Sequence, residues 1–127
     1  MKLRIQAGSI RFRVTPTELH ALATRGVVES AIQLGGSTGE RLRYLLESSP
    51  QSSSVELNYA PGVIQVILPE SIVRQWASTD QVGIETVQQV SGDTALKILI
   101  EKDFKCLQPR TDESEVDRFP NPAQESR

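Results

Sequence analysis

The sequence predicts an α+β protein of two tandem ββαββ units related by a pseudo-two-fold axis, with mostly antiparallel sheet and two short helices. Two observations predict this fold class. Apolar and polar side chains alternate along several short segments, which is the period of a β-strand with one exposed face. The order of strands, turns and helix in the first part of the chain then recurs 54 residues later.

The first unit, residues 1–47, begins with a predicted hairpin in which apolar and basic side chains alternate around a turn at Gly8. A helix follows, because Thr15, Pro16 and Glu18 have the spacing of a capping box with proline at the first helical position. Gly26 can end this helix. Two more strands are expected around a loop at residues 35–39, from the alternating side chains Val28, Ile32, Leu34, Leu42, Tyr44 and Leu46.

The second unit, residues 54–103, repeats this order. A type II turn is expected at Pro61 and Gly62, and a second helix is expected to begin after Pro69. A constant shift of 54 residues without a gap aligns Gly8 with Gly62, Ile10 with Ile64, Leu22 with Trp76, Val28 with Val82, Leu42 with Leu96 and Glu47 with Glu101. We interpret the repeat as an internal duplication. Because neither half can close a core alone, the halves should pack face to face or share a sheet.

Residues 1–108 are expected to form one domain, and residues 109–127 a polar C-terminal tail that is partly docked. The segment from Val63 to Leu68 is almost continuously apolar, so Val63 and Ile67 need a cover. Three alternatives could cover them: the C-terminal tail, the other half of the chain, or a second subunit in a homodimer. Within the tail we expect anchoring at Phe119, Pro120 and Pro122.

Composition limits the classes of function. The net charge of −2 gives little reason to expect nucleic-acid binding, although residues 1–47 hold seven Lys and Arg against four Asp and Glu, and residues 54–103 hold three against seven. Cys106 is the single cysteine and His20 the single histidine, so neither an intrachain disulfide nor a usual zinc site is expected, and no cofactor is predicted. No apolar run resembles a membrane span or a signal peptide, so the expected location is the cytoplasm.

The candidate site is a set of cations on the outward parity of the first unit. On one sheet face they would attract an anion, with an acidic protein segment favoured over phosphate because the whole chain is mildly acidic. The segment 112–117 of the same chain, or an acidic stretch of another chain, has this chemistry. The alternative interpretation is a solvated face that prevents edge pairing. The set comprises Lys2, Arg4, Arg11, Arg13, Arg41 and Arg43.

Other chemical groups give weaker signals. Cys106 has no visible base partner, and His20 occupies an ordinary flank of an amphipathic helix. The loop at residues 35–39 lacks the Lys-Ser/Thr ending of a phosphate loop. Trp76 is expected in the core. The carboxylates Glu85, Glu101 and Asp103 show no spacing that isolates an acid-base pair.

The segments Leu99–Leu107 and Phe119–Pro122, with the opening Met1–Ile5, Ser9–Arg11, Trp76 and Asp80–Gly83, resemble one family across almost the whole chain. It is a family of small bacterial proteins known only as domain of unknown function 7009. The resemblance implies a bacterial cytoplasmic protein. It carries no activity, ligand or catalytic residue.

Three functions remain open. The first is a small non-enzymatic binding or protein-interaction module, because the polar residues are spread over surfaces and do not converge. The second is a small enzyme that uses Arg and carboxylate residues near the junction of the two units. The third is a nucleic-acid-binding regulator that uses the basic face of the first unit. The segment Ile64–Ala77 loosely resembles swapped-hairpin regulators, but it lies in the acidic half.

Overall fold

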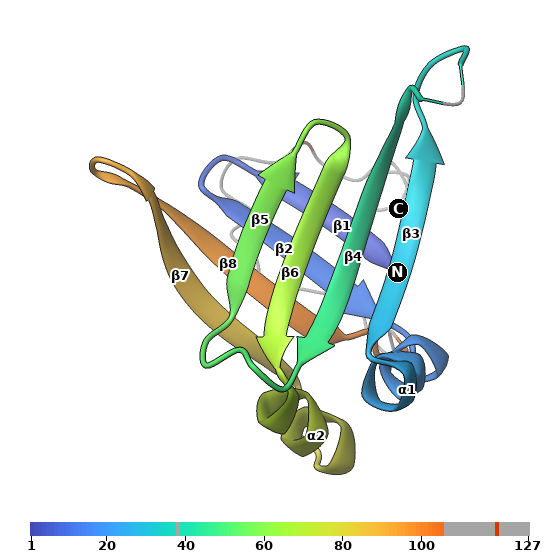
Figure 1. The fold of residues 1–127 in the computed structure, drawn as a ribbon, viewed down its shortest axis with the longest axis vertical. Coiled ribbons are helices and arrows are strands. Elements are labelled where there is room, and N and C mark those ends of the chain that lie inside the picture. The colour runs from blue at the N-terminus through green and yellow to red at the C-terminus, as the bar shows by residue number, and fades with distance from the viewer. Residues whose placement is uncertain (38, 106–118, 120–127) are drawn as a thin grey trace, which may run out of the picture.

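The computed structural model describes residues 1–37, 39–105 and 119, and it confirms the predicted order of elements. Figure 1 shows two sheets that face each other, with both helices at one end. The elements of the first unit are β1 (Lys2–Gln6), β2 (Ser9–Val14), α1 (Pro16–Arg25), β3 (Val27–Gln33) and β4 (Arg41–Ser49). Those of the second are β5 (Glu56–Ala60), β6 (Val63–Pro69), α2 (Glu70–Ser78), β7 (Gly83–Ser91) and β8 (Thr94–Lys102).

Each sheet combines one hairpin from each unit. The strand order is β1-β2-β8-β7 in the first sheet, here called sheet A, and β3-β4-β6-β5 in the second, sheet B. The hairpins are antiparallel and meet in the parallel pairs β2–β8 and β4–β6. Ile10 pairs with Ile98 in sheet A, and Ile64 pairs with Tyr44 in sheet B, so the 54-residue shift converts one parallel pair into the other. The units therefore share both sheets.

The shift is interrupted before β7, so the expectation of a repeat without a gap is wrong there. Val28 pairs with Leu46, whereas Ile84 pairs with Ile100, which is the counterpart of Leu46. Val28 therefore corresponds to Ile84, 56 residues later, and the predicted match with Val82 fails by two residues. The cause is the connection after each helix: only Gly26 lies between α1 and β3, whereas residues 79–82 lie between α2 and β7.

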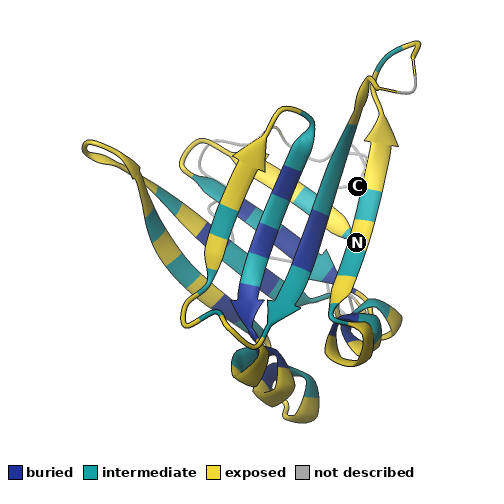
Figure 2. Cartoon of the chain, in the orientation of Figure 1, coloured by how far each residue is buried: buried dark blue, intermediate teal, exposed yellow. Residues whose placement is uncertain are grey.

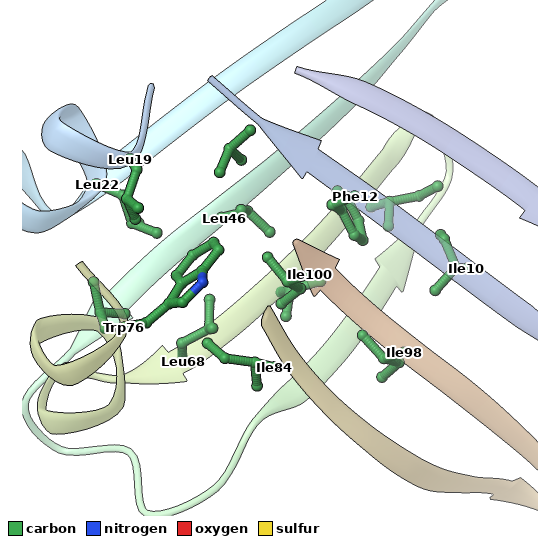
Figure 3. Close-up of a cluster of buried hydrophobic side chains, with 14 residues drawn as sticks. Ile10, Phe12, Leu19, Leu22, Leu46, Leu68, Trp76, Ile84, Ile98 and Ile100 are labelled. Carbon is green, nitrogen blue, oxygen red and sulfur yellow. The ribbon is translucent and has the colours of Figure 1, made fainter. Parts of the chain in front are cut away.

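The core lies between the two sheets and extends to the helices, as Figures 2 and 3 show. The expectation that Trp76 is a core residue is confirmed, because its side chain is fully buried. Its indole N–H donates a hydrogen bond of 3.2 Å to the carbonyl oxygen of Val82. The core cluster consists of Ile10, Phe12, Val14, Leu19, Leu22, Leu46, Ile64, Val66, Leu68, Val73, Trp76, Ile84, Ile98 and Ile100.

The predicted ends of α1 are confirmed. The Thr15 hydroxyl accepts from the backbone N–H of Glu18, and the Glu18 carboxylate accepts from the backbone N–H of Thr15, which completes the capping box. Gly26 adopts a φ of 86° at the C-terminal cap, and its N–H donates to the carbonyl of Leu22. This left-handed conformation turns the chain directly into β3. With ten and nine residues, neither helix of the described chain is long and apolar enough to cross a membrane.

The outer face of sheet B carries the apolar residues that were expected to need a cover. Val63 and Ile67 on β6 are half-buried there. Leu45 on the neighbouring strand β4, opposite Gln65, is buried. The ladder neighbours of Leu45 are Glu29 and Gln65, whose side chains bond to Arg43 and Glu47 on the same face. Polar side chains of sheet B itself thus supply part of the cover.

The expected anchoring of Phe119 is wrong, because its side chain is 98% exposed. Burial of a phenylalanine is what would have stabilised a docked tail, and this contribution is absent at Phe119. The other residues of that expectation, Pro120 and Pro122, lie outside the described residues, as do Cys106 and the acidic segment 112–117.

Candidate functional site

Four of the six predicted site residues come together on the outer face of sheet A. Lys2 and Arg4 lie on β1, Arg11 and Arg13 lie on β2, and the ladder places Lys2 opposite Arg13 and Arg4 opposite Arg11. Because every second side chain points to the same face, all four project away from the core. They line a shallow hollow of about 140 Å³ together with Leu3. We call Lys2, Arg4, Arg11 and Arg13 the cationic surface.

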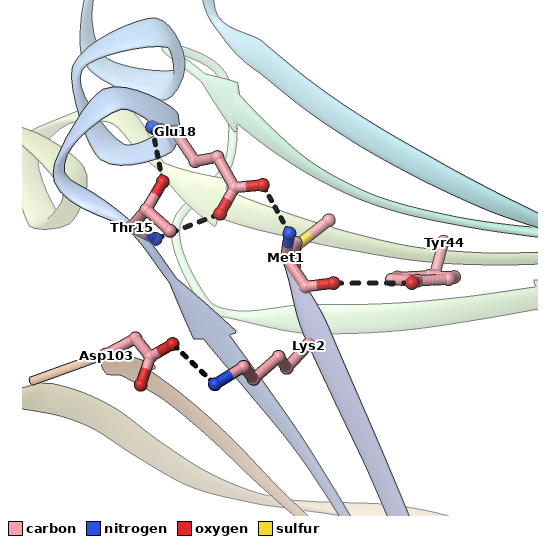
Figure 4. Close-up of polar contacts among 6 residues, drawn as sticks. All are labelled: Met1, Lys2, Thr15, Glu18, Tyr44 and Asp103. Atoms are coloured by element: carbon pink, nitrogen blue, oxygen red, sulfur yellow. Dashed lines mark hydrogen bonds and ion pairs between the residues drawn. The ribbon is translucent and has the colours of Figure 1, made fainter. Parts of the chain in front are cut away.

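Two members of the cationic surface are held by carboxylates of the segment that ends β8. Arg11 forms an ion pair with Glu101. The Nζ of Lys2 lies 3.1 Å from Oδ2 of Asp103 (Figure 4). Within the described part of the chain, Arg4 and Arg13 form no ion pair. The surface thus presents two guanidinium groups that those carboxylates leave free to bind an anion.

Arg41 and Arg43 do not join this surface, so the expectation that six cations share one face is wrong for these two. Both lie on β4, which belongs to sheet B. The guanidinium of Arg43 donates hydrogen bonds of 2.7 and 2.9 Å to the carboxylate of Glu29 on β3. These bonds raise the pKa of Arg43 and hold the pKa of Glu29 below its ordinary value. The sequence alone could not show that β4 pairs with β6 and not with β2.

The second unit has no cations at the positions equivalent to the cationic surface. The 54-residue shift relates β1 and β2 to β5 and β6, whose ladders have the same register. The counterparts of Lys2, Arg4, Arg11 and Arg13 are Glu56, Asn58, Gln65 and Ile67. Since sheet B forms the same hairpin with these residues, the hairpin does not require four cations.

The start of β1 is fixed by contacts that sequence patterns did not identify (Figure 4). The amino group of Met1 forms an ion pair with the Glu18 carboxylate, and the Tyr44 hydroxyl donates a hydrogen bond of 3.3 Å to the carbonyl of Met1. Burial alone would raise the pKa of Glu18, but the hydrogen bonds and charge from the Met1 amino group, with the bonds from Thr15, lower it. The capping-box spacing predicts the role of Glu18 at the start of α1. Its contact with Met1 depends on the tertiary fold, so no local sequence pattern indicates it.

Two hollows related by the pseudo-two-fold axis lie beside the helices. The larger, about 380 Å³, lies between α1 and the end of β8, and its lining includes His20, Lys102, Asp103 and Phe104. The smaller, about 270 Å³, is lined by Ser48 and Arg74, the counterparts of Lys102 and His20, among others. In the larger hollow Lys102 Nζ donates a hydrogen bond of 2.8 Å to the Thr79 carbonyl and Asp103 is paired with Lys2. Lys102 and Asp103 are thus already engaged in structural contacts.

The other predicted groups do not assemble into a reactive site within the described residues. The His20 ring is exposed and makes no side-chain hydrogen bond there. Glu101 and Asp103 are engaged with the cationic surface, and Glu85 lies 3.6 Å from Lys97. No group of three His, Cys, Asp or Glu side chains in the described ranges is arranged to hold a metal ion.

The chain is thus a small α+β protein in which each sheet combines one hairpin from each ββαββ unit. Sheet A carries the cationic surface on its outer face. The chain belongs to the family of unknown function DUF7009, whose model matches residues 1–123. The family resemblance of the sequence is thereby confirmed. No curated protein matches the chain. No solved structure matches it either.

Proposed function

We propose that this chain is a non-enzymatic binding module that holds an acidic segment of another protein on the cationic surface. The observation that carries the proposal is the pairing of like charges across the β1–β2 ladder, Lys2 with Arg13 and Arg4 with Arg11. Like charges placed directly opposite each other destabilise a sheet, by about 0.2–1 kcal/mol on the scale of cross-strand pair energies. An acidic ligand that bridges the pairs offsets this cost.

The comparison between the units supports a binding role. Asn58 and Gln65 occupy the positions of Arg4 and Arg11 in an equivalent hairpin, so the fold forms without that like-charge pair. Arg11 is already paired with Glu101, whereas Arg4 and Arg13 have no carboxylate partner in the described part of the chain. Guanidinium groups bind carboxylates through paired hydrogen bonds, which favours an acidic side chain as the ligand.

The surroundings of the cationic surface favour a short acidic segment over a nucleic acid. Three carboxylates of the second unit lie in or next to the same sheet. Glu85 is on β7, Glu101 is on β8, and Asp103 directly follows β8. A long phosphate backbone that crosses the sheet would meet these carboxylates, and the chain has a net charge of −2. A segment of a few residues can remain over β1 and β2.

The test is a titration of the full chain against a fluorescein-labelled octaglutamate peptide, followed by fluorescence anisotropy. Replacing Arg4→Asn together with Arg11→Gln introduces the residues of the second unit and should weaken binding by about tenfold. The variant removes the guanidinium of Arg4 that binds the peptide, and it leaves the Glu101 carboxylate without the charge of Arg11, so that this carboxylate repels an acidic ligand. Arg41→Asn, a cation of sheet B, is the matched control and should leave affinity unchanged. Equal affinity of all three proteins would refute the proposal, as would tighter binding of single-stranded DNA of the same charge.

A further inference from the structure

The free edges of the two sheets differ at one pair of equivalent positions. At the edge of sheet B, the Gln88 side chain of β7 binds the backbone of β5: its Oε1 accepts from the N–H of Leu57 at 2.7 Å, and its Nε2 donates to the carbonyl of Leu57 at 2.9 Å. One amide group therefore satisfies both outward backbone groups of this edge residue and links the sheets.

The counterpart of Leu57 at the edge of sheet A is Leu3 on β1. Leu57 pairs with Val66 and Leu3 with Phe12, which are equivalent pairs in equivalent ladders. Because Leu57 directs its N–H and carbonyl away from β6 toward Gln88, the same pairing directs those of Leu3 away from β2. No hydrogen bond from another element reaches these two groups of Leu3 within the described part of the chain.

The counterpart of Gln88 is Ile32, which cannot form this link. Gln88 pairs with Leu96 and Ile32 pairs with Leu42, and Leu42 and Leu96 are equivalent. The Ile32 side chain has neither a donor nor an acceptor. It is 50% exposed, and Ile5, the next residue of β1 with the parity of Leu3, is 61% exposed. Among the described residues, apolar side chains thus adjoin backbone groups of β1 that have no hydrogen-bond partner there.

We infer that β1 receives an extended segment of a partner protein as an additional strand of sheet A, and that acidic and apolar residues alternate in this segment. The inference rests on the proposed function and specifies its binding mode. A strand added to β1 alternates its side chains between two faces. One face lies beside Lys2 and Arg4, which favours carboxylates. The other lies beside Leu3, Ile5 and Ile32, which favours apolar side chains.

A second copy of this chain does not fit the same edge. Pairing β1 with β1 of another molecule would place Lys2 and Arg4 beside their own copies, and like charges in neighbouring strands repel. The charge pattern of β1 thus disfavours self-association at this edge and matches an acidic strand.

The probe is a seven-residue peptide in which glutamate alternates with valine, compared with a peptide of the same composition whose glutamates and valines form two blocks. Both are titrated into the full chain and followed by anisotropy and by amide hydrogen exchange at Leu3 and Ile5. We expect the alternating peptide to bind about tenfold more tightly than the block peptide, and to slow exchange at Leu3 by at least about tenfold.

Substitutions at Ile32, beside the β1 edge, and at Gln88, beside the β5 edge, provide the decisive comparison. Ile32→Gln copies the second unit, so its amide should cover the backbone of Leu3 and weaken binding of the alternating peptide by about tenfold while the four cations remain. Gln88→Ile opens the β5 edge beside Glu56 and Asn58, and this acidic edge should gain no binding of the peptide. Circular dichroism spectra of both variants check that the fold is retained.

The outcomes separate this inference from the proposed function. If Arg4→Asn with Arg11→Gln abolishes binding but Ile32→Gln has no effect and Leu3 exchange is unchanged, the cationic surface binds the peptide by its face and strand addition is wrong. If no variant changes affinity, both proposals fail. If Leu3 is already protected in the free chain, its own C-terminal segment or a second copy occupies the edge, and the assignment to a partner is overturned.

Discussion

Glu18 combines three structural roles in one carboxylate. It closes the capping box with Thr15, it lies in the first turn of α1, and it forms the ion pair with the amino group of Met1. The first role stabilises a helix terminus by hydrogen bonds, the second by the helix dipole, and the third attaches the start of β1 to the helix. Because the third contact joins residues 17 positions apart, Glu18 couples local structure to the tertiary fold.

Replacement of Glu18 separates its charge from its hydrogen bonds. Glu18→Gln retains a side chain that can complete a capping box, so the loss, about 1 kcal/mol at neutral pH, should come from the missing charge. The pKa of Glu18 is lowered on folding. Its stabilisation is therefore present above the unfolded pKa of a glutamate and is lost as pH falls through the folded pKa. Urea titrations from pH 7 to pH 3 should show the two proteins converging at acid pH; a constant difference would contradict this.

Trp76 is the largest fully buried side chain and has one polar atom. Its N–H donates to the carbonyl oxygen of Val82, which lies in the connection of residues 79–82 between α2 and β7. Trp76→Phe should destabilise the protein by about 1–3 kcal/mol, because it leaves a small cavity and an unsatisfied carbonyl. Urea unfolding followed by far-UV circular dichroism measures the change. Gln75→Ala on the exposed side of α2 is the control and should be nearly neutral; an equal loss in both variants would contradict a core role.

At the scale of elements, the two helices end differently, so the connections that lead from them to the next strand differ in length. α1 ends at Gly26, which takes a left-handed conformation and leads directly into β3. α2 is capped by Thr79 in extended conformation, and a longer connection follows before β7. The pairing of β3 and β7 is thereby offset by two residues relative to the rest of the repeat. The different C-terminal caps of α1 and α2 thus accompany the point at which the 54-residue repeat is interrupted.

Gly26→Ala tests the cap. A Cβ at this position would lie 3.9 Å from the Ser48 carbonyl, which is ordinary contact, so the cost is that of a left-handed backbone conformation. We expect a loss of about 1–2 kcal/mol in the free energy of unfolding. Gly36→Ala in the β3–β4 loop has open space and no positive φ, and should be nearly neutral. Thermal melts of both variants measure the contrast; equal melting temperatures would show that Gly26 is not needed as a cap.

At the scale of the whole molecule, neither unit contains a complete sheet. Sheet A needs β7 and β8 from the second unit, and sheet B needs β3 and β4 from the first. The core cluster likewise draws on both units, from Ile10 and Leu46 in the first to Trp76 and Ile98 in the second. The two units therefore share both sheets and one core, although the repeat suggests two modules.

Separate halves should not fold as monomers. Residues 1–52 and residues 53–127, produced separately, should each lack dispersed amide signals at low concentration, because β2 and β6 would lose their parallel partners. Mixing the halves should restore the spectrum of the intact chain. A self-paired dimer of one half is consistent with the pseudo-two-fold axis. A folded monomeric half would contradict the shared-sheet architecture.

Much of the fold was predictable because it depends on local patterns. The alternation of side chains located the strands, Thr15 and Glu18 located the start of α1, and Gly26 located its end. The four cations of the β1–β2 hairpin could also be grouped, because the two strands of a hairpin are neighbours in sequence. The sequence by itself therefore determined the order of elements, the fold class and the core of the candidate site.

The tertiary structure decided which hairpins share a sheet, because strand pairing between distant segments leaves no local period in the sequence. That pairing separates Arg41 and Arg43 from the cationic surface and places Glu101 and Asp103 beside it. It also sets the contrast between Gln88 and Ile32, since a glutamine becomes a backbone clamp only when a strand edge of the opposite sheet lies within reach. Local periodicity determines what each segment becomes, and long-range contacts determine which segments meet.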